Sequence, residues 1–370
     1  MNRTSTDELF MKQTFRLAKK GIGKVAPNPL VGSVIVKSGQ VIATGWHDSY
    51  SKPHAEAVAL HNAGENARGS DLFVNLEPCC HWGKTPPCTD AIIRAGIKRV
   101  IFSNEDSNPK VRQCDSQQAL MQAGIEVVSG ILAQQGRLLN EVFFKYMETG
   151  LPFVALKMGL TLDARIADRY GESKWITSEA SRRDVGRIRS RYDAIMVGIG
   201  TVLKDNPSLG IRRGTHTLTK IIMDPDLQLP LNAKLFEDGS KVLVVSEKRH
   251  HGSTRHNEHL ARGVLFIFLE AGTTGFNLVP ALQAIAQRSM TSILVEGGGK
   301  LAHSLISQRL VDKLYWYIAP KLFADNQSKP VLDGEMDRCI GDLEKFSLNH
   351  VRRIGDDVRL VYYPTLPQNG

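Results

Sequence analysis

Hydrophobic positions in the first part of the chain alternate between the periods of helices and of strands. Apolar residues about 3.6 positions apart predict a helix over residues 7–20, and two β-rich runs at 31–36 and 41–45 predict a hairpin. The alternation continues to residue 129, with helices expected over 53–61, from 90 and over 116–123, and strands over 72–76, 99–103 and 126–129. Such alternation predicts a sheet with helices on its faces.

The hydrophobic pattern is interrupted at residues 146–152 and then starts again. We therefore expect one domain over residues 1–149 and a second over 150–370. Residues 248–262 are rich in His, Arg and Gly, and we expect them to form an exposed loop or a fraying helix. Elsewhere in the second domain a helix is expected from Ser178, and strands at 153–158, 194–197, 220–223, 242–245, 264–269, 292–295 and 314–318.

Two glycine-rich segments of the second domain are candidates for dinucleotide binding. The segment Gly297-Gly298-Gly299 separates an apolar strand from a predicted helix, whose free N–H groups can hold a pyrophosphate. A tight strand-to-helix turn is the structural alternative for the same residues. The segment Gly198-Ile199-Gly200 gives only an incomplete fingerprint, in which Asp224 would bind the ribose. We therefore favour the triple glycine, with Glu296 directed at whatever it holds.

The composition indicates an ordinary globular protein. The chain has 370 residues, of which 42% are hydrophobic and 23% charged, and this length suits about two domains. We find no run of about eighteen apolar residues and no apolar signal core near the N-terminus, so we expect no membrane span, no secretory signal and a cytoplasmic location. The net charge of +9 suits nucleic acids or phosphorylated small molecules. Its basic residues are scattered, with clusters at 182–183, 187–191 and 248–251, which favours the small molecules.

Three of the five cysteines lie close together, at positions 79, 80 and 88. This clustering favours metal-binding thiolates in a reduced compartment over a disulfide framework. Cys114 and Cys339 stand apart in the sequence. We expect both to be unpaired packing residues without a redox role.

The residue types of a catalytic zinc site occur in two short segments. His54, Cys79 and Cys88 offer one imidazole and two thiolates, which leaves the fourth tetrahedral position for water. Glu56 follows two residues after the histidine, where its carboxylate can move protons between that water and a leaving ammonia. This arrangement is the signature of the nucleobase deaminases. It indicates hydrolytic deamination.

The residues around the zinc motif suggest a substrate pocket. Eight residues separate Cys79 from Cys88, which is more than metal binding requires, and we expect this loop to form a pocket wall. In the loop Lys84 suits an anionic group as a point charge. In the stiff segment 26–29, Asn28 has a donor and an acceptor to offer a base edge.

Five motifs in one order carry a family resemblance. They are His-Ala-Glu at 54–56, Glu-Pro-Cys-x-His-x-Gly-Lys-Thr-Pro-Pro-Cys at 77–88, Gly-Glu-Ser-x-Trp-Ile-Thr at 171–177, Thr-Val-Leu-x-Asp-x-Pro at 201–207 and Val-Glu-Gly-Gly at 295–298. With these motifs the chain resembles the bifunctional riboflavin biosynthesis proteins, in which a pyrimidine deaminase is fused to a pyrimidine reductase. The resemblance implies an α/β fold class, with an N-terminal cytidine-deaminase-like α/β/α domain and a C-terminal dihydrofolate-reductase-like α/β domain.

The resemblance also implies two reactions and the residues that serve them. The first domain would remove an amino group from a diaminopyrimidinone ribose phosphate with Zn²⁺, and the second would reduce the ribosyl group to ribityl with NADPH. Zinc would be held by His54, Cys79 and Cys88, with Glu56 as the proton shuttle, and the deaminase pocket would be lined by Asn28, His47, His81 and Lys84. NADPH would be held by Gly159, Trp175, Thr201, Asp205, Gly297, Gly298 and Gly299. The reductase substrate would be held by Ser173, Arg189, Leu209, Arg212 and Glu296. Lys157 and Asp205 are candidate proton donors in the reduction.

Three positions depart from the family's usual residues. Cys80 replaces a serine, and its thiol could compete with Cys79 for zinc, although adjacent residues seldom bind one ion. Ala164 replaces a glycine, a change that a position with positive φ would resist. Pro225 replaces a serine, which leaves the preference for NADPH over NADH open.

A nucleic-acid deaminase of the tRNA adenosine type is the main alternative, because it shares the zinc motif and a basic charge. Such an enzyme needs stacking aromatics near its pocket, whereas Trp82 is the only aromatic residue in the zinc loop. A structural zinc module is less suitable, because structural sites are normally closed by four ligands. We therefore expect a phosphorylated pyrimidine as substrate, no nucleic-acid or membrane partner, and a homo-oligomer, either dimer or tetramer.

Overall fold

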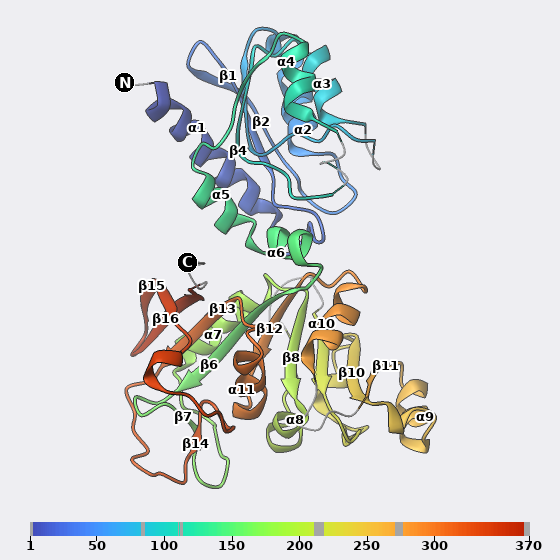
Figure 1. The fold of residues 1–370 in the computed structure, drawn as a ribbon, viewed down its shortest axis with the longest axis vertical. Coiled ribbons are helices and arrows are strands. Elements are labelled where there is room, and N and C mark those ends of the chain that lie inside the picture. The colour runs from blue at the N-terminus through green and yellow to red at the C-terminus, as the bar shows by residue number, and fades with distance from the viewer. Residues whose placement is uncertain are drawn as a thin grey trace. The chain divides into compact units, whose positions relative to one another are not determined.

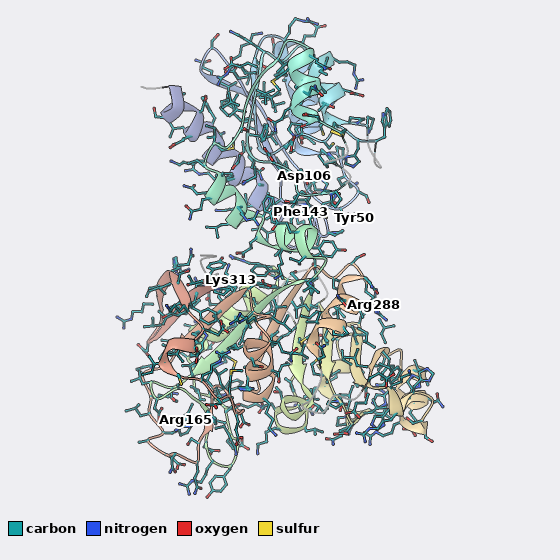
Figure 2. All side chains as sticks on the ribbon, viewed as in Figure 1. Tyr50, Asp106, Phe143, Arg165, Arg288 and Lys313 are labelled. Atoms are coloured by element: carbon teal, nitrogen blue, oxygen red, sulfur yellow. A yellow bond between two sulfur atoms is a disulfide. The ribbon has the colours of Figure 1, made fainter. Side chains whose placement is uncertain are left out.

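The computed structural model describes residues 3–82, 86–109, 111, 114–210, 218–270 and 277–365. The chain forms two compact units, Met1–Gly150 and Leu151–Gly370. Figure 1 shows the ribbon of each unit, and Figure 2 adds the side chains. Within the described residues, no helix combines the length and the apolar character needed to cross a membrane.

The first unit is built around a five-stranded sheet with the order β2-β1-β3-β4-β5. The hairpin of β1 and β2 is antiparallel, β1 is antiparallel to β3, and β3, β4 and β5 are parallel. Its elements are α1 (Arg3–Ala18), β1 (Gly32–Lys37), β2 (Gln40–Trp46), α2 (Ala55–Ala63), β3 (Asp71–Leu76), α3 (Cys88–Arg94), β4 (Arg99–Asn104), α4 (Ser116–Gln122), β5 (Glu126–Val128), α5 (Ala133–Leu139) and α6 (Glu141–Thr149).

Alternate residues of these strands build two separate cores. Phe73 and Ile101 pack with α1 on one face of the sheet, whereas the neighbouring residues Leu72 and Val100 pack on the other face. This alternation follows from the two-residue period of a strand. Figure 1 shows α1 and α5 on one side of the sheet and α2, α3 and α4 on the other. The result is a three-layer α/β/α unit.

The second unit is built around a nine-stranded sheet with the order β11-β10-β9-β8-β12-β6-β13-β16-β15. The strands from β11 to β13 in this order are parallel, and β16 and β15 extend the sheet in antiparallel fashion. A separate two-stranded sheet pairs β7 with β14. The elements are β6 (Phe153–Leu160), β7 (Arg165–Ala167), α7 (Glu179–Arg189), β8 (Ala194–Gly198), α8 (Ile199–Asp205), β9 (Thr219–Met223), β10 (Val242–Glu247), α9 (Thr254–Ala261), β11 (Leu265–Leu269), α10 (Leu278–Ala286), β12 (Ser292–Glu296), α11 (Gly299–Ser307), β13 (Lys313–Ile318), β14 (Lys329–Pro330), β15 (Phe346–Ile354) and β16 (Asp357–Pro364).

Two local predictions from the sequence were wrong. Of the two alternatives for residues 248–262 the structure has a helix, α9, but the expected exposure was wrong for His256 and His259, which are buried on it. Their rings contact Phe266, and His259 also hydrogen-bonds the carbonyl of Leu229. The helix expected from Pro53 begins at Ala55 instead. The hairpin of β15 and β16 was not predicted, because β15 is almost entirely exposed and therefore has no apolar alternation.

Ala164 occupies a position with a left-handed backbone, φ = +55°. It lies in the turn between β6 and β7, where its N–H donates to the carbonyl of Thr161. A residue with a Cβ atom costs about 1–2 kcal/mol in this conformation. The chain therefore tolerates alanine at a position whose geometry favours glycine.

Candidate active sites

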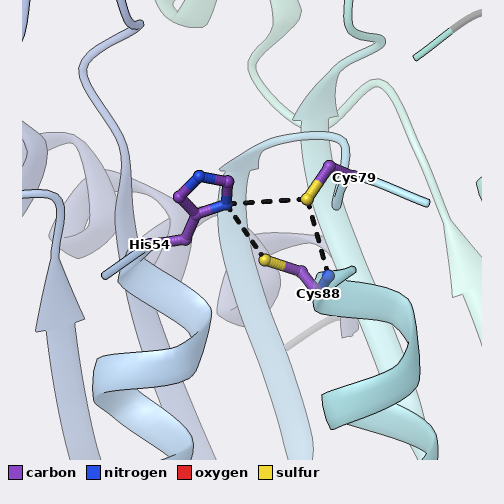
Figure 3. Close-up of side chains that lie close together, drawn as sticks. All are labelled: His54, Cys79 and Cys88. Atoms are coloured by element: carbon purple, nitrogen blue, oxygen red, sulfur yellow. Dashed lines mark hydrogen bonds between the residues drawn. The ribbon is translucent and has the colours of Figure 1, made fainter. Parts of the chain in front are cut away.

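Three side chains of the first unit meet in a group that can hold a metal ion. His54 precedes α2 with an extended backbone, Cys79 follows β3, and Cys88 is the first residue of α3. Nδ1 of His54 lies 3.2 Å from Sγ of Cys88 and 3.5 Å from Sγ of Cys79 (Figure 3). A zinc ion with tetrahedral angles and ordinary bond lengths places nitrogen and sulfur ligands about 3.5 Å apart. The donor set and its spacing therefore fit zinc.

The protonation of this group depends on its close contacts. A hydrogen bond with Cys79 raises the pKa of His54 to about 9. The hydrogen bond with the Cys88 thiol lowers the pKa of Cys79 to about 4, despite burial, and His54 adds to this effect. The pKa of Cys88 is raised by the Cys79 thiolate and by burial. The two sulfurs thus share one proton, and a bound cation would replace it.

Glu56 is buried in the first turn of α2, with 4% of its surface exposed. Burial raises the pKa of its carboxyl group, which also hydrogen-bonds Cys88. Residues two apart point in different directions on a regular helix. The extended backbone of His54 removes this restriction, so Glu56 reaches the same group as the histidine. A buried carboxyl group beside a metal-binding cluster can transfer protons.

Two of the predicted pocket residues form a hydrogen-bonded chain. Nδ1 of His47 lies 3.1 Å from the carbonyl oxygen of Pro53, which can only accept, so this nitrogen carries the proton. Nε2 then accepts from the amide of Asn28 at 3.1 Å. Burial lowers the pKa of His47, although the bond to Pro53 opposes this effect. The ring is therefore neutral and its tautomer is fixed.

The remaining pocket residues of the first unit are less completely defined. Nδ1 of His81 is buried and has no hydrogen-bond partner within the described part of the chain. This nitrogen is available to a ligand. Lys84 lies outside the described residues.

Asp106 and Glu77 belong to the same region but were missed from the sequence. Burial raises the pKa of Asp106 to about 7, and Glu56 and Cys79 add to this effect. Its carboxylate accepts from the N–H of Asn108, and its own N–H donates to Glu77 at 3.0 Å. Asp106, labelled in Figure 2, follows β4, the parallel neighbour of the strand that precedes Cys79. The position of Asp106 after a predicted strand could have indicated a site residue, because loops after adjacent parallel strands lie together.

Cys80 and Cys114 form a disulfide across 34 positions. The expectation that Cys114 is unpaired and that the chain lacks disulfides was therefore wrong. Both residues lie in the loops that follow β3 and β4, which the sheet brings together. Because its sulfur is bonded to Cys114, Cys80 cannot compete with Cys79 for zinc. Cys339 is free, as predicted, but it is exposed rather than a packing residue.

In the second unit, Glu296 at the end of β12 forms a bidentate ion pair with Arg189 at the end of α7. The two N–O distances are 2.6 and 3.0 Å, and Nζ of Lys157 lies 3.6 Å from the same carboxylate. Burial alone would raise the pKa of Glu296, but Arg189 and Lys157 lower it to about 2. Arg189 also donates to the carbonyl of Gly210. Its guanidinium is therefore already engaged where the resemblance assigns it to substrate.

The two glycine segments lie side by side, because β8 and β12 are neighbours in the sheet. Gly297 and Gly298 have φ angles of +85° and +76°, which favour glycine. A Cβ atom on Gly297 would lie 3.2 Å from the hydroxyl of Thr201 on α8. The turn before α11 therefore packs closely against Thr201, and a side chain at position 297 would have little space. Asp224 is fully buried and accepts from the N–H groups of Gln228 and Leu229, which leaves it unsuited to the ribose role of the alternative fingerprint.

The other predicted reductase residues form smaller groups. Ser173 hydrogen-bonds Asp205, whose pKa is raised by burial. The ring of Trp175 is 61% exposed and lies 4.3 Å from the guanidinium of Arg182. Leu209 is buried with φ = +56°. Arg212 lies outside the described residues.

Gly159 on β6 packs closely against the residue that precedes α7. A Cβ atom there would lie 3.1 Å from Cγ2 of Thr177. Any larger residue would push these segments apart.

Known proteins match both units. Residues 4–104 match the cytidine and deoxycytidylate deaminase zinc-binding region, and residues 152–360 match the RibD C-terminal domain. The riboflavin biosynthesis protein RibD of Actinobacillus pleuropneumoniae is 38% identical over 99% of this chain and 97% of its own length. That of Escherichia coli is 36% identical over 96% of this chain and 98% of its own length.

Solved structures agree with these matches. RibD of Acinetobacter baumannii is 35% identical, with a TM-score of 0.88 over 98% of this chain and 100% of that chain. A diaminohydroxyphosphoribosylaminopyrimidine deaminase/5-amino-6-(5-phosphoribosylamino)uracil reductase of Thermotoga maritima is also 35% identical, with a TM-score of 0.87 over the same shares. The predicted fold class is confirmed, and the alternative of a nucleic-acid deaminase is not supported. The chain belongs to the riboflavin biosynthesis protein RibD family, whose members combine a zinc-dependent deaminase with an NADPH-dependent reductase.

Proposed function

We propose that this chain carries out two successive reactions on one pyrimidine ribotide. Residues 1–149 would hydrolyse an amino group of 2,5-diamino-6-(5-phosphoribosylamino)pyrimidin-4(3H)-one. Residues 150–370 would then reduce its ribosyl group with NADPH and release 5-amino-6-(5-phosphoribitylamino)uracil. The observation that carries the proposal is the zinc-compatible spacing of His54, Cys79 and Cys88 beside the buried Glu56.

In the deaminase, zinc would supply a water molecule whose pKa is lowered to near 7. Glu56 takes a proton from this water and later gives it to the departing ammonia, and its raised pKa suits both steps. The neutral His47 fixes the orientation of the Asn28 amide by a hydrogen bond, and the amide would then offer a donor and an acceptor at the pocket wall. Nδ1 of His81, which has no hydrogen-bond partner among the described residues, would contact the pyrimidine. These groups orient the ring for attack.

In the reductase, NADPH would supply the hydride. The Gly297-Gly298-Gly299 turn and the first N–H groups of α11 can hold its pyrophosphate, with Thr201 alongside. Glu296 and Arg189 would bind the sugar or its phosphate. We favour Lys157 over Asp205 as the proton donor, because Lys157 pairs with Glu296, whereas Asp205 contacts Ser173.

The binding partner that we propose is the phosphorylated pyrimidine substrate, and we propose no nucleic-acid or membrane partner. The enzyme would work in the cytoplasm as a homo-oligomer, either a dimer or a tetramer. Light scattering of the purified chain measures its mass in solution. A monomer at micromolar concentration would contradict this part of the proposal.

The decisive experiment incubates the purified, zinc-loaded chain with the diaminopyrimidinone ribotide and follows the product masses. Deamination is expected without any dinucleotide, and reduction only after NADPH is added. His54→Ala should abolish the first reaction and leave reduction of the deaminated intermediate intact. If reduction required the zinc ligands, or if deamination required NADPH, the assignment of one reaction to each unit would be wrong.

A further inference from the structure

We propose that the second unit has a binding site for a small molecule with two or more phosphate groups, separate from the reductase site. The site is a cleft of about 390 Å³ between the last turn of α7 and the strands β13, β15 and β16. Lys313, labelled in Figure 2, contributes the first side chain of β13. The other charged and polar residues that line the cleft are Asp184, Arg187, Arg191, Tyr315, Asn349, His350, Arg352 and Arg359.

Two pairs of like charges converge on this cleft. Arg187 lies in the last turn of α7, Arg191 follows the end of that helix, and both line the cleft. Arg352 and Arg359 are direct partners across the antiparallel pair β15 and β16, where equal charges are unfavourable. Equal charges held around one space cost stability, and among the described residues Asp184 offsets this cost only at Arg359. An anion bound between them removes that cost.

Among the described residues that line the cleft, one carries a carboxylate, and it is already hydrogen-bonded. Asp184 accepts a hydrogen bond from the hydroxyl of Tyr317 and another from Nη1 of Arg359, both at 2.7 Å. Of the described residues, four arginines and Lys313 line the cleft together with one acidic group, which is only 9% exposed. This excess of positive charge matches a ligand with several negative charges.

Several donors in the cleft lack an acceptor within the part of the chain that the structure describes. Nε of Arg359 is buried without a hydrogen-bond partner. Arg187, Arg191 and Arg352 are exposed, and no ion pair is found for them in the described ranges. Guanidinium groups bind phosphate through two parallel hydrogen bonds. The unpaired donors therefore favour phosphate over a simple halide.

The cleft does not belong to the reductase site. Arg189 is two residues from Arg187, which places it about 200° away around α7, and it pairs with Glu296. The cleft also lies on the antiparallel extension of the sheet, whereas the glycine turns follow the parallel strands β8 and β12. A ligand in the cleft is thus a second ligand.

The test measures binding of inorganic tripolyphosphate to the full chain by calorimetry, with zinc and a saturating amount of NADP⁺ present. Arg352→Gln should weaken binding by roughly tenfold or more, because it removes a charged hydrogen-bond donor. The matched control is Arg353→Gln on the same strand, whose side chain is 79% exposed and pairs with Asp356 outside the cleft. This control should bind tripolyphosphate as the wild type does. The double variant Arg187→Gln/Arg191→Gln should bind more weakly than Arg352→Gln.

Three results would overturn the proposal. The first is the absence of saturable binding beyond that of an equal concentration of sulfate. The second is an equal loss of affinity in Arg352→Gln and Arg353→Gln, which indicates only general attraction to a basic surface. The third is a single-stranded RNA that binds more tightly than tripolyphosphate and depends on Arg352, because the cleft would then serve nucleic acid. The comparison of variants measures binding in the cleft, and it does so whether or not the reductase site is filled. Its outcome is therefore independent of the proposed reactions.

Discussion

Replacing Glu296 by glutamine should destabilise the second unit and reveal how much its ion pairs contribute. The carboxylate has 10% side-chain exposure and contacts two cations, Arg189 and Lys157. Its pKa is about 2 in the folded chain, against an ordinary value of 4.5. At about 1.4 kcal/mol per pKa unit, this difference corresponds to roughly 3 kcal/mol of stability at neutral pH. Leaving buried cations without their partner predicts a similar cost of about 3–5 kcal/mol.

The pH dependence of this effect has a defined sign. Because folding lowers the pKa of Glu296, its stabilisation is fully present above about pH 4.5 and is lost as the pH falls toward 2. The difference between wild type and Glu296→Gln should therefore shrink below pH 4.5, to about 2 kcal/mol near pH 3.5.

Scanning calorimetry measures both effects, because the two compact units can give separate transitions. The transition of the second unit should shift in Glu296→Gln, while that of the first unit stays in place. The control is Glu270→Gln, which removes an exposed ion pair with Lys248 and should have a much smaller effect on the transition. Equal effects of the two variants, or a Glu296→Gln effect that does not change between pH 7 and pH 3.5, would refute the reasoning.

Three further outcomes are expected in the first unit. Glu56→Gln should lower the rate of deamination by about 10²–10⁴-fold without changing the zinc content by mass spectrometry, and a loss of metal would show that the residue is structural. Removal of zinc with a chelator should abolish deamination and leave NADPH-dependent reduction intact, whereas loss of both activities would contradict separate sites. Reduction of the Cys80–Cys114 disulfide, or the double serine variant, should lower the stability of this unit by up to about 4 kcal/mol, because the bond closes a loop of 34 positions. An unchanged thermal transition would show that the two loops are held together by other contacts.

The sequence was most informative where the functional residues are close neighbours in the chain. The histidine and glutamate of the zinc motif are two positions apart, and the triple glycine is continuous, so each could be recognised from local chemistry. The apolar run at residues 72–76 likewise predicted the strand β3, although not which face each side chain covers. These features depend only on the periods of helices and strands.

Long-range partners could not be predicted in the same way. A local pattern shows which side of an element is apolar, but not which loops meet in the fold. Cys80 and Cys114 become neighbours only because β3 and β4 are adjacent and parallel. His256 gave no apolar signal, because its burial depends on the distant ring of Phe266.

Topology accounts for the position of both candidate sites. In a sheet with parallel strands, the loops after the carboxyl ends of the strands form the natural binding edge. Cys79 and Asp106 follow β3 and β4 in the first unit, and Gly198 and Gly297 follow β8 and β12 in the second. This rule does not account for the basic cleft beside β15 and β16, because these strands are antiparallel. The reductase site therefore does not explain its arginine pairs, which we assign to the separate anionic ligand proposed above.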